Sequence, residues 1–222
     1  MKKYIVCGYT PWSKKVFDQK ISKYNGNWFL FSKKSDLTLS RIKKIDPVFI
    51  FFLHWSWIVP KEIVDNYNCV CFHMTDVPYG RGGSPLQNLI VRGHKTTKLT
   101  ALKMDQGMDT GPVYLKRQMP LDGKASEIYE RAYLLSSEMI KNVIKGIKPK
   151  PQTGKSTVFK RRKPEQSEIT AEKISDVYDY IRMLDAEGYP LAFVKKDGFL
   201  YEFFDATLEK KEVIAKVRIK KI

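Results

Sequence analysis

The sequence predicts a doubly wound α/β fold with a mostly parallel sheet, followed by a small α+β extension at the C-terminus. Strand-like apolar runs alternate with helical stretches over roughly the first 120 residues, as they do in βαβ units. The run PVFIFFLHW at 47–55 is almost wholly apolar, which is typical of a strand buried on both faces of a parallel sheet. The alternation ends at KPKPQTGKS, residues 148–156, whose proline, glycine and charge are typical of a linker.

Hydrophobic spacing and turn residues place the elements in order. The predicted strands cover 3–8, 27–31, 47–55, 68–73, 98–105 and 112–121. The predicted helices cover 13–21, 35–44, 60–67, 85–92 and 125–146. Ser84, Pro85 and Gln87 give the helix at 85–92 a start with a capping box, and Gly93 gives it a left-handed stop. This order predicts a Rossmann-like arrangement, in which ligands collect at the carboxyl ends of the strands.

A second region follows the linker. A helix is predicted near 171–185, and strands are predicted near 191–197, 199–206 and 213–222. We therefore divide the chain into a domain at 1–150 and a region at 151–222 that holds the linker and the small helix-and-strand extension. Short strands with open edges favour pairing across a homodimer, which we expect here.

Composition narrows the class of protein. The 222 residues are 43% hydrophobic, which excludes a disordered chain and allows one sizeable core. The apolar run in the opening MKKYIVCGYTPW is interrupted at Gly8 and Pro11, too early for a signal peptide, and no run reaches the length of a membrane span. We therefore expect a cytoplasmic protein that binds no membrane. Cys7, Cys69 and Cys71 have no CxxC spacing, which predicts free thiols rather than a disulfide framework or a zinc site.

The net charge of +16 predicts a polyanionic partner. The densest basic cluster, at 145–163, holds eight basic residues and no acidic one. The alternative is a solvated, lysine-rich surface, since most charge runs lie in water. Charge alone does not choose between the phosphates of a nucleotide and those of a nucleic acid.

One histidine, His73, ends the predicted strand at 68–73 and precedes a glycine-rich loop. A single histidine at a strand end is more often a hydrogen-bonded structural residue than a catalyst. A second loop, DQGMDTG at 105–111, lies between two predicted strands and is, on the simpler interpretation, an ordinary Asp-Gly turn. A carboxylate beside an imidazole orients it and stabilises its charged form, so the two loops together indicate a catalytic pair.

Two stretches, FHMTDVPYGRGGSPLQNLI at 72–90 and TALKMDQGMDTGPVYLKRQMPL at 100–121, resemble the folate-dependent formyltransferase family. That family has a histidine at a strand end, a loop with Pro and Arg-Gly before a helix that starts with Pro, and an Asp-x-Gly-x-Asp-Thr-Gly loop. The stretch FFLHWSWIVPKEIV at 51–64 is similar to the family's loop that lines the folate pocket. The resemblance makes 1–150 a formyltransferase catalytic domain.

The resemblance implies an enzyme that transfers a formyl group from 10-formyltetrahydrofolate to an amine and needs no metal. His73 and Asp109 match the family's catalytic histidine and aspartate. Cys71 stands where the family has an asparagine that helps to hold the formyl oxygen. A thiol is a weak hydrogen-bond donor, and losing an oxyanion donor costs about 100- to 1000-fold in rate unless a backbone amide or His73 takes over.

The resemblance also implies two sets of binding residues. The pterin is expected against the side chains of Trp57, Ile58 and Val59 and the backbone of Gln106, Gly107 and Met108. The acceptor is expected near Thr75, Asp76, Arg81 and Lys14.

The C-terminal region bears on the acceptor. It is shorter than the C-terminal barrel domain of methionyl-tRNA formyltransferases, although FKRRKPEQSEI at 159–169 resembles their linker. The stretch SDVYDYIRMLDAEGYPLAFV at 175–194 resembles the N-formyltransferases of nucleotide-linked amino sugars. We therefore predict a nucleotide-linked amino sugar as acceptor, as in lipopolysaccharide or O-antigen biosynthesis. The alternatives are a methionyl-tRNA formyltransferase-like enzyme, a non-catalytic nucleic-acid-binding relative, and hydrolysis of the formyl folate by water.

Overall fold

The structure is a computed structural model that describes all residues from 1 to 222 and contains two compact units. The first unit comprises 1–82, 98–119 and 130–158, and the second comprises 83–97, 120–129 and 159–222. The second unit thus takes two segments from the part of the chain before residue 150. A separate domain at 1–150 stays a prediction.

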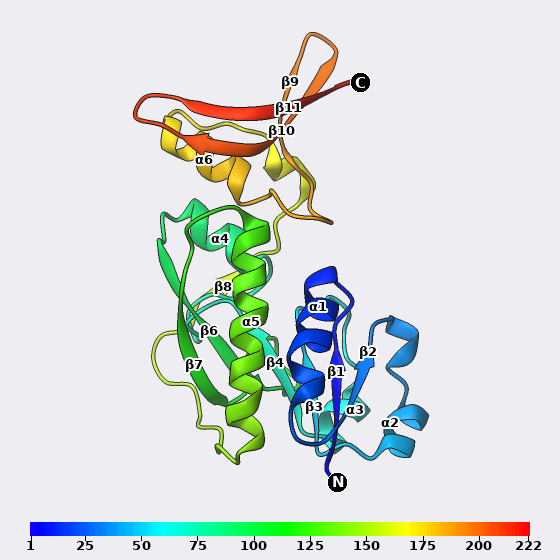
Figure 1. Ribbon diagram of the computed structural model, residues 1–222. Coiled ribbons are helices and arrows are strands. Elements are labelled where there is room, and N and C mark those ends of the chain that lie inside the picture. Colours follow the sequence, from blue (N-terminus) through cyan, green and yellow to red (C-terminus); the bar gives the residue numbers. More distant parts are fainter. The chain divides into compact units, whose positions relative to one another are not determined.

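A six-stranded sheet forms the centre of the first unit, in the order β2-β1-β3-β4-β6-β7 (Figure 1). Its strands are β1 (Lys3–Cys7), β2 (Asn27–Phe31), β3 (Phe49–Phe52), β4 (Cys69–His73), β6 (Thr96–Lys103) and β7 (Val113–Pro120). The pairs from β2 to β4 are parallel, whereas β4 and β6 are antiparallel. The predicted doubly wound, mostly parallel sheet is therefore confirmed.

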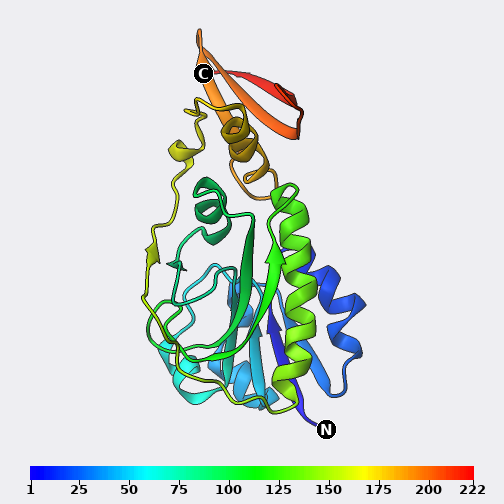
Figure 2. The ribbon, with the colours of Figure 1, turned by 90° about the vertical axis from the view of Figure 1, so that its left-hand side faces the viewer.

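Helices cover both faces of this sheet. The helices α1 (Pro11–Gln19) and α5 (Ala125–Ile144) lie on one face, and α2 (Leu39–Ile45) and α3 (Lys61–Asn66) lie on the other (Figures 1 and 2). The start of α1 is encoded locally, because the Thr10 side chain accepts the N–H of Ser13 at 3.2 Å and Pro11 occupies the first helical turn.

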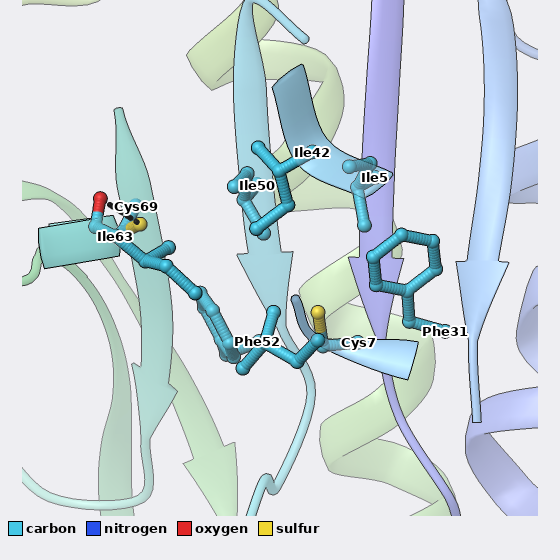
Figure 3. Close-up of a cluster of buried hydrophobic side chains, with 9 residues drawn as sticks. Ile5, Cys7, Phe31, Ile42, Ile50, Phe52, Ile63 and Cys69 are labelled. Atoms are coloured by element: carbon cyan, nitrogen blue, oxygen red, sulfur yellow. Dashed lines mark hydrogen bonds between the residues drawn. The ribbon is translucent and has the colours of Figure 1, made fainter. Parts of the chain in front are cut away.

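Alternate residues of the central strands build one of the two cores. Ile5 and Cys7 of β1 point to the same side as Ile50 and Phe52 of β3, because side chains two positions apart share a face of a strand (Figure 3). Ile42 of α2, Ile63 of α3, Phe31 and Cys69 lie in the same cluster, as does Leu37. Burying each large aliphatic side chain there contributes about 1.5–3 kcal/mol to stability. Cys69, the first residue of β4, belongs to this cluster, so the cluster helps to position β4 and its last residue, His73.

The three cysteines are free. Cys7 and Cys69 are buried, whereas Cys71 is partly exposed. The helices of this structure are each too short or too polar to span a lipid bilayer.

The second unit holds the α+β extension. Its elements are α4 (Pro85–Val91), α6 (Ile174–Arg182), β9 (Ala192–Lys196), β10 (Phe199–Leu208) and β11 (Val213–Lys221). The strands form an antiparallel sheet in the order β11-β10-β9, and α6 packs against β10. The remaining elements are short: β5 (Arg81–Gly82), β8 (Val158–Phe159), and 3-10 turns at Ile21–Lys23, Lys34–Asp36 and Pro164–Ser167.

The predicted capping box of α4 is wrong. Ser84 has a left-handed backbone, with φ of 48°, and its side chain makes no capping bond. Its hydroxyl instead accepts the backbone N–H of Arg162 at 3.0 Å. Gln87 is buried, and its amide donates to the hydroxyl of Tyr129 at 3.2 Å and the carbonyl of Met183 at 3.1 Å. Both side chains that the sequence pattern assigns to the cap therefore form hydrogen bonds with residues distant in the sequence instead.

Candidate active site

The candidate site is centred on His73, the last residue of β4. The ring is largely buried, with 8% of the residue exposed. Its Nε2 lies 2.8 Å from the carbonyl oxygen of Gly80, and its Nδ1 lies 3.4 Å from Oδ2 of Asp109. The hydroxyl of Thr75 donates to the same Gly80 carbonyl at 3.2 Å. The ring is thus held between a carbonyl and a carboxylate in a defined orientation.

Asp109 reaches His73 from the loop between β6 and β7. Its backbone is left-handed, with φ of 55°, and its Oδ2 accepts the N–H of Gly82 at 2.9 Å. Asp105 organises the same loop, since its Oδ1 accepts the hydroxyl of Thr110 at 2.6 Å and the N–H of Gly107 at 3.0 Å. The structure therefore brings together the two catalytic residues that the sequence predicts.

Both neighbours of the His73 ring are hydrogen-bond acceptors. A neutral imidazole has one N–H and donates to only one of them, whereas a protonated ring donates to both. The ring is therefore arranged to take up a proton and release it again while it stays in place. This is the behaviour expected of a general acid–base catalyst.

A second histidine, His54, follows β3 and is missed by the sequence reasoning. Its backbone is left-handed, with φ of 49°, and its ring centre lies 4.7 Å from that of Tyr133. Burial, together with the nearby His73, lowers the pKa of His54 to about 4. His54 is therefore neutral at pH 7 and adds no charge beside His73. No sequence signal separates His54 from an ordinary apolar-run histidine.

Cys71 lies two residues before His73 on β4 and so shares its face of the sheet. It packs against the buried cluster of Figure 3. Burial, with a smaller effect of the Asp109 charge, raises the pKa of the Cys71 thiol. Cys71 therefore presents a neutral thiol at pH 7, which makes it a poor nucleophile and a weak donor.

The residues predicted to hold the pterin lie on two loops. Trp57 contacts Tyr9 and Trp55, with ring centres 4.6 and 4.8 Å away, and Val59 packs against the core. The Nε1 of Trp55 is buried without a hydrogen-bond partner, so this aromatic group has a donor available. Ile58 is 93% exposed. Gln106, Gly107 and Met108 are exposed as well. Folate binding by these residues stays a prediction.

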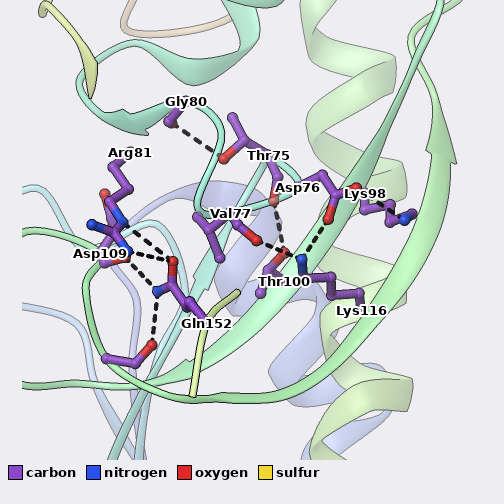
Figure 4. A network of polar contacts seen from close by, with 11 residues as sticks. Thr75, Asp76, Val77, Gly80, Arg81, Lys98, Thr100, Asp109, Lys116 and Gln152 are labelled. Carbon is purple, nitrogen blue, oxygen red and sulfur yellow. Dashed lines mark hydrogen bonds and ion pairs between the residues drawn. The ribbon is translucent and has the colours of Figure 1, made fainter. Parts of the chain in front are cut away.

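The residues predicted to contact the acceptor differ in their surroundings. Thr75 is buried, and its carbonyl accepts the hydroxyl of Thr100 at 2.7 Å. Asp76 forms ion pairs with Lys98 and Lys116 (Figure 4). Burial raises the pKa of Asp76, but the two ammonium groups outweigh it and hold the pKa below its usual value. Lys14 is exposed on α1. Acceptor binding by this set stays a prediction.

Arg81 and Gln152 form a contact that the sequence reasoning misses. The guanidinium of Arg81 donates through Nε and Nη2 to Oε1 of Gln152, at 3.2 and 2.8 Å (Figure 4). Gln152 lies in the stretch 148–156, which the composition marks as a linker. In the sequence, Gln152 is marked only by its place between Pro151 and Gly154, and a glutamine between such turn residues does not indicate a functional role.

No three His, Cys, Asp or Glu side chains are grouped so that they can hold a metal ion. His73, placed between the carboxylate of Asp109 and the carbonyl of Gly80, is the candidate for proton transfer at this site.

Comparison with known proteins gives the family. Residues 164–220 match the family described as the methionyl-tRNA formyltransferase C-terminal domain. The solved methionyl-tRNA formyltransferase from Clostridium thermocellum is 46% identical, the match covers 100% of both chains, and the TM-score is 0.94. The methionyl-tRNA formyltransferase of Thermodesulfovibrio yellowstonii is 31% identical over 145 residues, which are 61% of this chain and 47% of that protein. The chain belongs to the formyltransferase family of enzymes.

The chain spans about half the length of the curated relatives it matches. A more distant structure is that of WlaRD, a sugar 3N-formyltransferase crystallised in the presence of dTDP and 5-N-formyl-THF. It is 14% identical, the match covers 98% of each chain, and the TM-score is 0.64. At that identity the likeness concerns the fold alone. The predicted closeness to sugar N-formyltransferases is therefore corrected, because methionyl-tRNA formyltransferases are the nearer relatives.

Proposed function

We propose that this protein transfers a formyl group from 10-formyltetrahydrofolate to the amino group of methionyl-tRNA. The observation that carries the transfer reaction is the pair formed by His73 and Asp109 at 3.4 Å, held at the end of β4. The 46% identity over the whole chain supports methionyl-tRNA as the acceptor rather than the amino sugar that the sequence alone favours. The net charge of +16 agrees with a nucleic-acid partner.

The reaction requires one proton to move. The amine nitrogen attacks the formyl carbon, which leaves negative charge on the formyl oxygen and positive charge on the attacking nitrogen. The amine then loses a proton, the bond between the formyl carbon and the folate nitrogen breaks, and that nitrogen gains a proton. His73 carries the proton between the two nitrogens, and Asp109 stabilises the ring while it is charged.

The test is an acceptor assay. The purified protein is incubated with 10-formyltetrahydrofolate and either methionyl-tRNA or a panel of nucleotide-linked amino sugars, and added formyl groups are measured by mass spectrometry. We expect formylation of methionyl-tRNA only. Formylation of a sugar instead would restore the acceptor predicted from the sequence. Release of formate without any amine would show hydrolysis, and tRNA binding without formyl transfer would favour the non-catalytic relative.

Restoring the family's asparagine tests the Cys71 position. We expect Cys71→Asn to raise kcat by about 10-fold or more, because a side-chain amide donates a stronger hydrogen bond to an oxyanion than a thiol does. The measurement is kcat at saturating donor and acceptor, with Cys71→Ser as a control that changes polarity but not shape. A fall in kcat for Cys71→Asn, with folding intact, would show that the surroundings of the thiol require its smaller volume.

A further inference from the structure

Gln152 links the segment after α5 to both loops of the candidate site. Its amide Nε2 donates to the backbone carbonyls of Asp109 and Gly111, at 2.8 Å each. Its Oε1 accepts from Arg81, as described above. Because Arg81 has only donors and carbonyls are only acceptors, this arrangement fixes which end of the amide faces which loop. One side chain thus ties three segments together (Figure 4).

The bond to Asp109 acts on a strained residue. A left-handed backbone is uncommon for a residue other than glycine, and Asp109 adopts it with φ of 55°. This conformation directs the carboxylate towards Nδ1 of His73. Two residues later, the loop packs tightly at Gly111. An added Cβ there would lie 1.8 Å from the carbonyl oxygen of Lys103, so only glycine fits. Gln152 therefore binds the carbonyls on either side of Thr110, at the point where the loop turns.

We propose that Gln152 is a positioning residue of the reaction, which holds the backbone of Asp109 so that its carboxylate stays against His73. Arg81 holds Gln152 in turn, by binding its Oε1. The hydrogen bonds of Gln152 run to Arg81 and to the carbonyls of Asp109 and Gly111, so its effect on His73 passes through Asp109. The proposal deepens the proposed function, because it rests on His73 and Asp109 as the catalytic pair.

Two substitutions separate the halves of this contact. Gln152→Glu keeps an oxygen for Arg81 but replaces the donor that faces the two carbonyls with a second acceptor. Gln152→Ala removes both halves. Misplacement of a catalytic group by about 1 Å costs up to about 100-fold, so we expect kcat to fall about 10- to 100-fold in both variants while the donor KM changes little. Thr153→Ala, a change at the exposed neighbouring residue, is the matched control.

A readout independent of turnover comes from the ring nitrogens of His73, observed by 15N NMR in the labelled full chain and assigned with His73→Gln. We expect their shifts to move in both Gln152 variants and to stay in Thr153→Ala, with thermal unfolding showing that each variant is folded. Gln152→Glu keeps the size of the side chain and serves if Gln152→Ala does not fold.

Unchanged His73 shifts in a folded Gln152 variant would overturn the positioning role, whatever the activity. If the shifts move but the wild-type protein formylates no methionyl-tRNA, the proposed acceptor fails while the role of Gln152 stands. The NMR readout and the acceptor assay therefore report the two proposals separately.

Discussion

His73→Ala is expected to abolish formyl transfer while the protein stays folded. In the proposed mechanism, the ring carries the proton from the attacking amine to the departing folate nitrogen. General acid–base catalysis contributes a factor of about 100 to 10,000 to the rate of a reaction. The substitution also leaves the carboxylate of Asp109 without its partner, so we expect kcat to fall by at least about 1000-fold. The alanine leaves the Gly80 carbonyl bonded to Thr75, which keeps one of its contacts.

The measurement is kcat with methionyl-tRNA at saturating 10-formyltetrahydrofolate, beside thermal unfolding of the same preparation. His94→Ala, at a histidine of the second unit, is the matched control and should retain activity within a few-fold. Near-normal kcat in folded His73→Ala would remove His73 from the mechanism. The loss of one or two hydrogen bonds should lower the free energy of unfolding by about 1–2 kcal/mol.

The fold follows from the sequence because its signals are local. The apolar run at 47–55 predicts a buried strand, and β3 (Phe49–Phe52) lies within it. The spacing at 13–21 predicts a helix, although α1 starts two residues earlier, at Pro11. His73 is found for the same reason, since the strand at 68–73 ends where the apolar run ends. Elements set by hydrophobic period are therefore predictable.

The contacts around the site are less predictable, because they join residues distant in the sequence. Gln152 lies in a stretch whose composition indicates a linker, yet it binds the carbonyls of Asp109 and Gly111, about 40 residues earlier. Ser84 and Gln87 satisfy a local capping pattern but find better partners elsewhere in the second unit. In a segment without helical or strand periodicity, the neighbouring residues do not indicate which distant group a polar side chain will bind.

The identity of the acceptor is hard to predict from the sequence for a different reason. The sequence carries stretches that resemble two kinds of formyltransferase, at 159–169 and at 175–194. The shorter C-terminal region favours the amino-sugar enzymes, whereas the comparisons show greater similarity to methionyl-tRNA formyltransferases. The match of 164–220 to the methionyl-tRNA formyltransferase C-terminal domain includes the whole of the second stretch and the end of the first, from residue 164. Length separates the two kinds of enzyme only if every methionyl-tRNA formyltransferase has the longer C-terminal barrel, and the solved Clostridium thermocellum chain is matched over 100% of its length by this one.

Asp109→Asn is the second substitution expected to have a large effect, because it removes the charge and little else. Asparagine tolerates the left-handed backbone that Asp109 adopts, so the loop should keep its shape. Its Oδ1 can still accept the N–H of Gly82. What disappears is the carboxylate charge 3.4 Å from Nδ1 of His73, on which the proposed mechanism relies while the ring carries the proton.

In the serine protease triad, the same exchange of aspartate for asparagine beside a catalytic histidine lowers kcat about 10,000-fold. We expect a fall of about 1000- to 10,000-fold for Asp109→Asn, measured as kcat with methionyl-tRNA. Asp105→Asn is the matched control: it also removes a carboxylate from this loop, but one that bonds to Thr110 and Gly107 rather than to His73. Equal losses in the two variants would assign the effect to loop structure, whereas a loss confined to Asp109→Asn would assign it to the charge that His73 needs while it carries the proton.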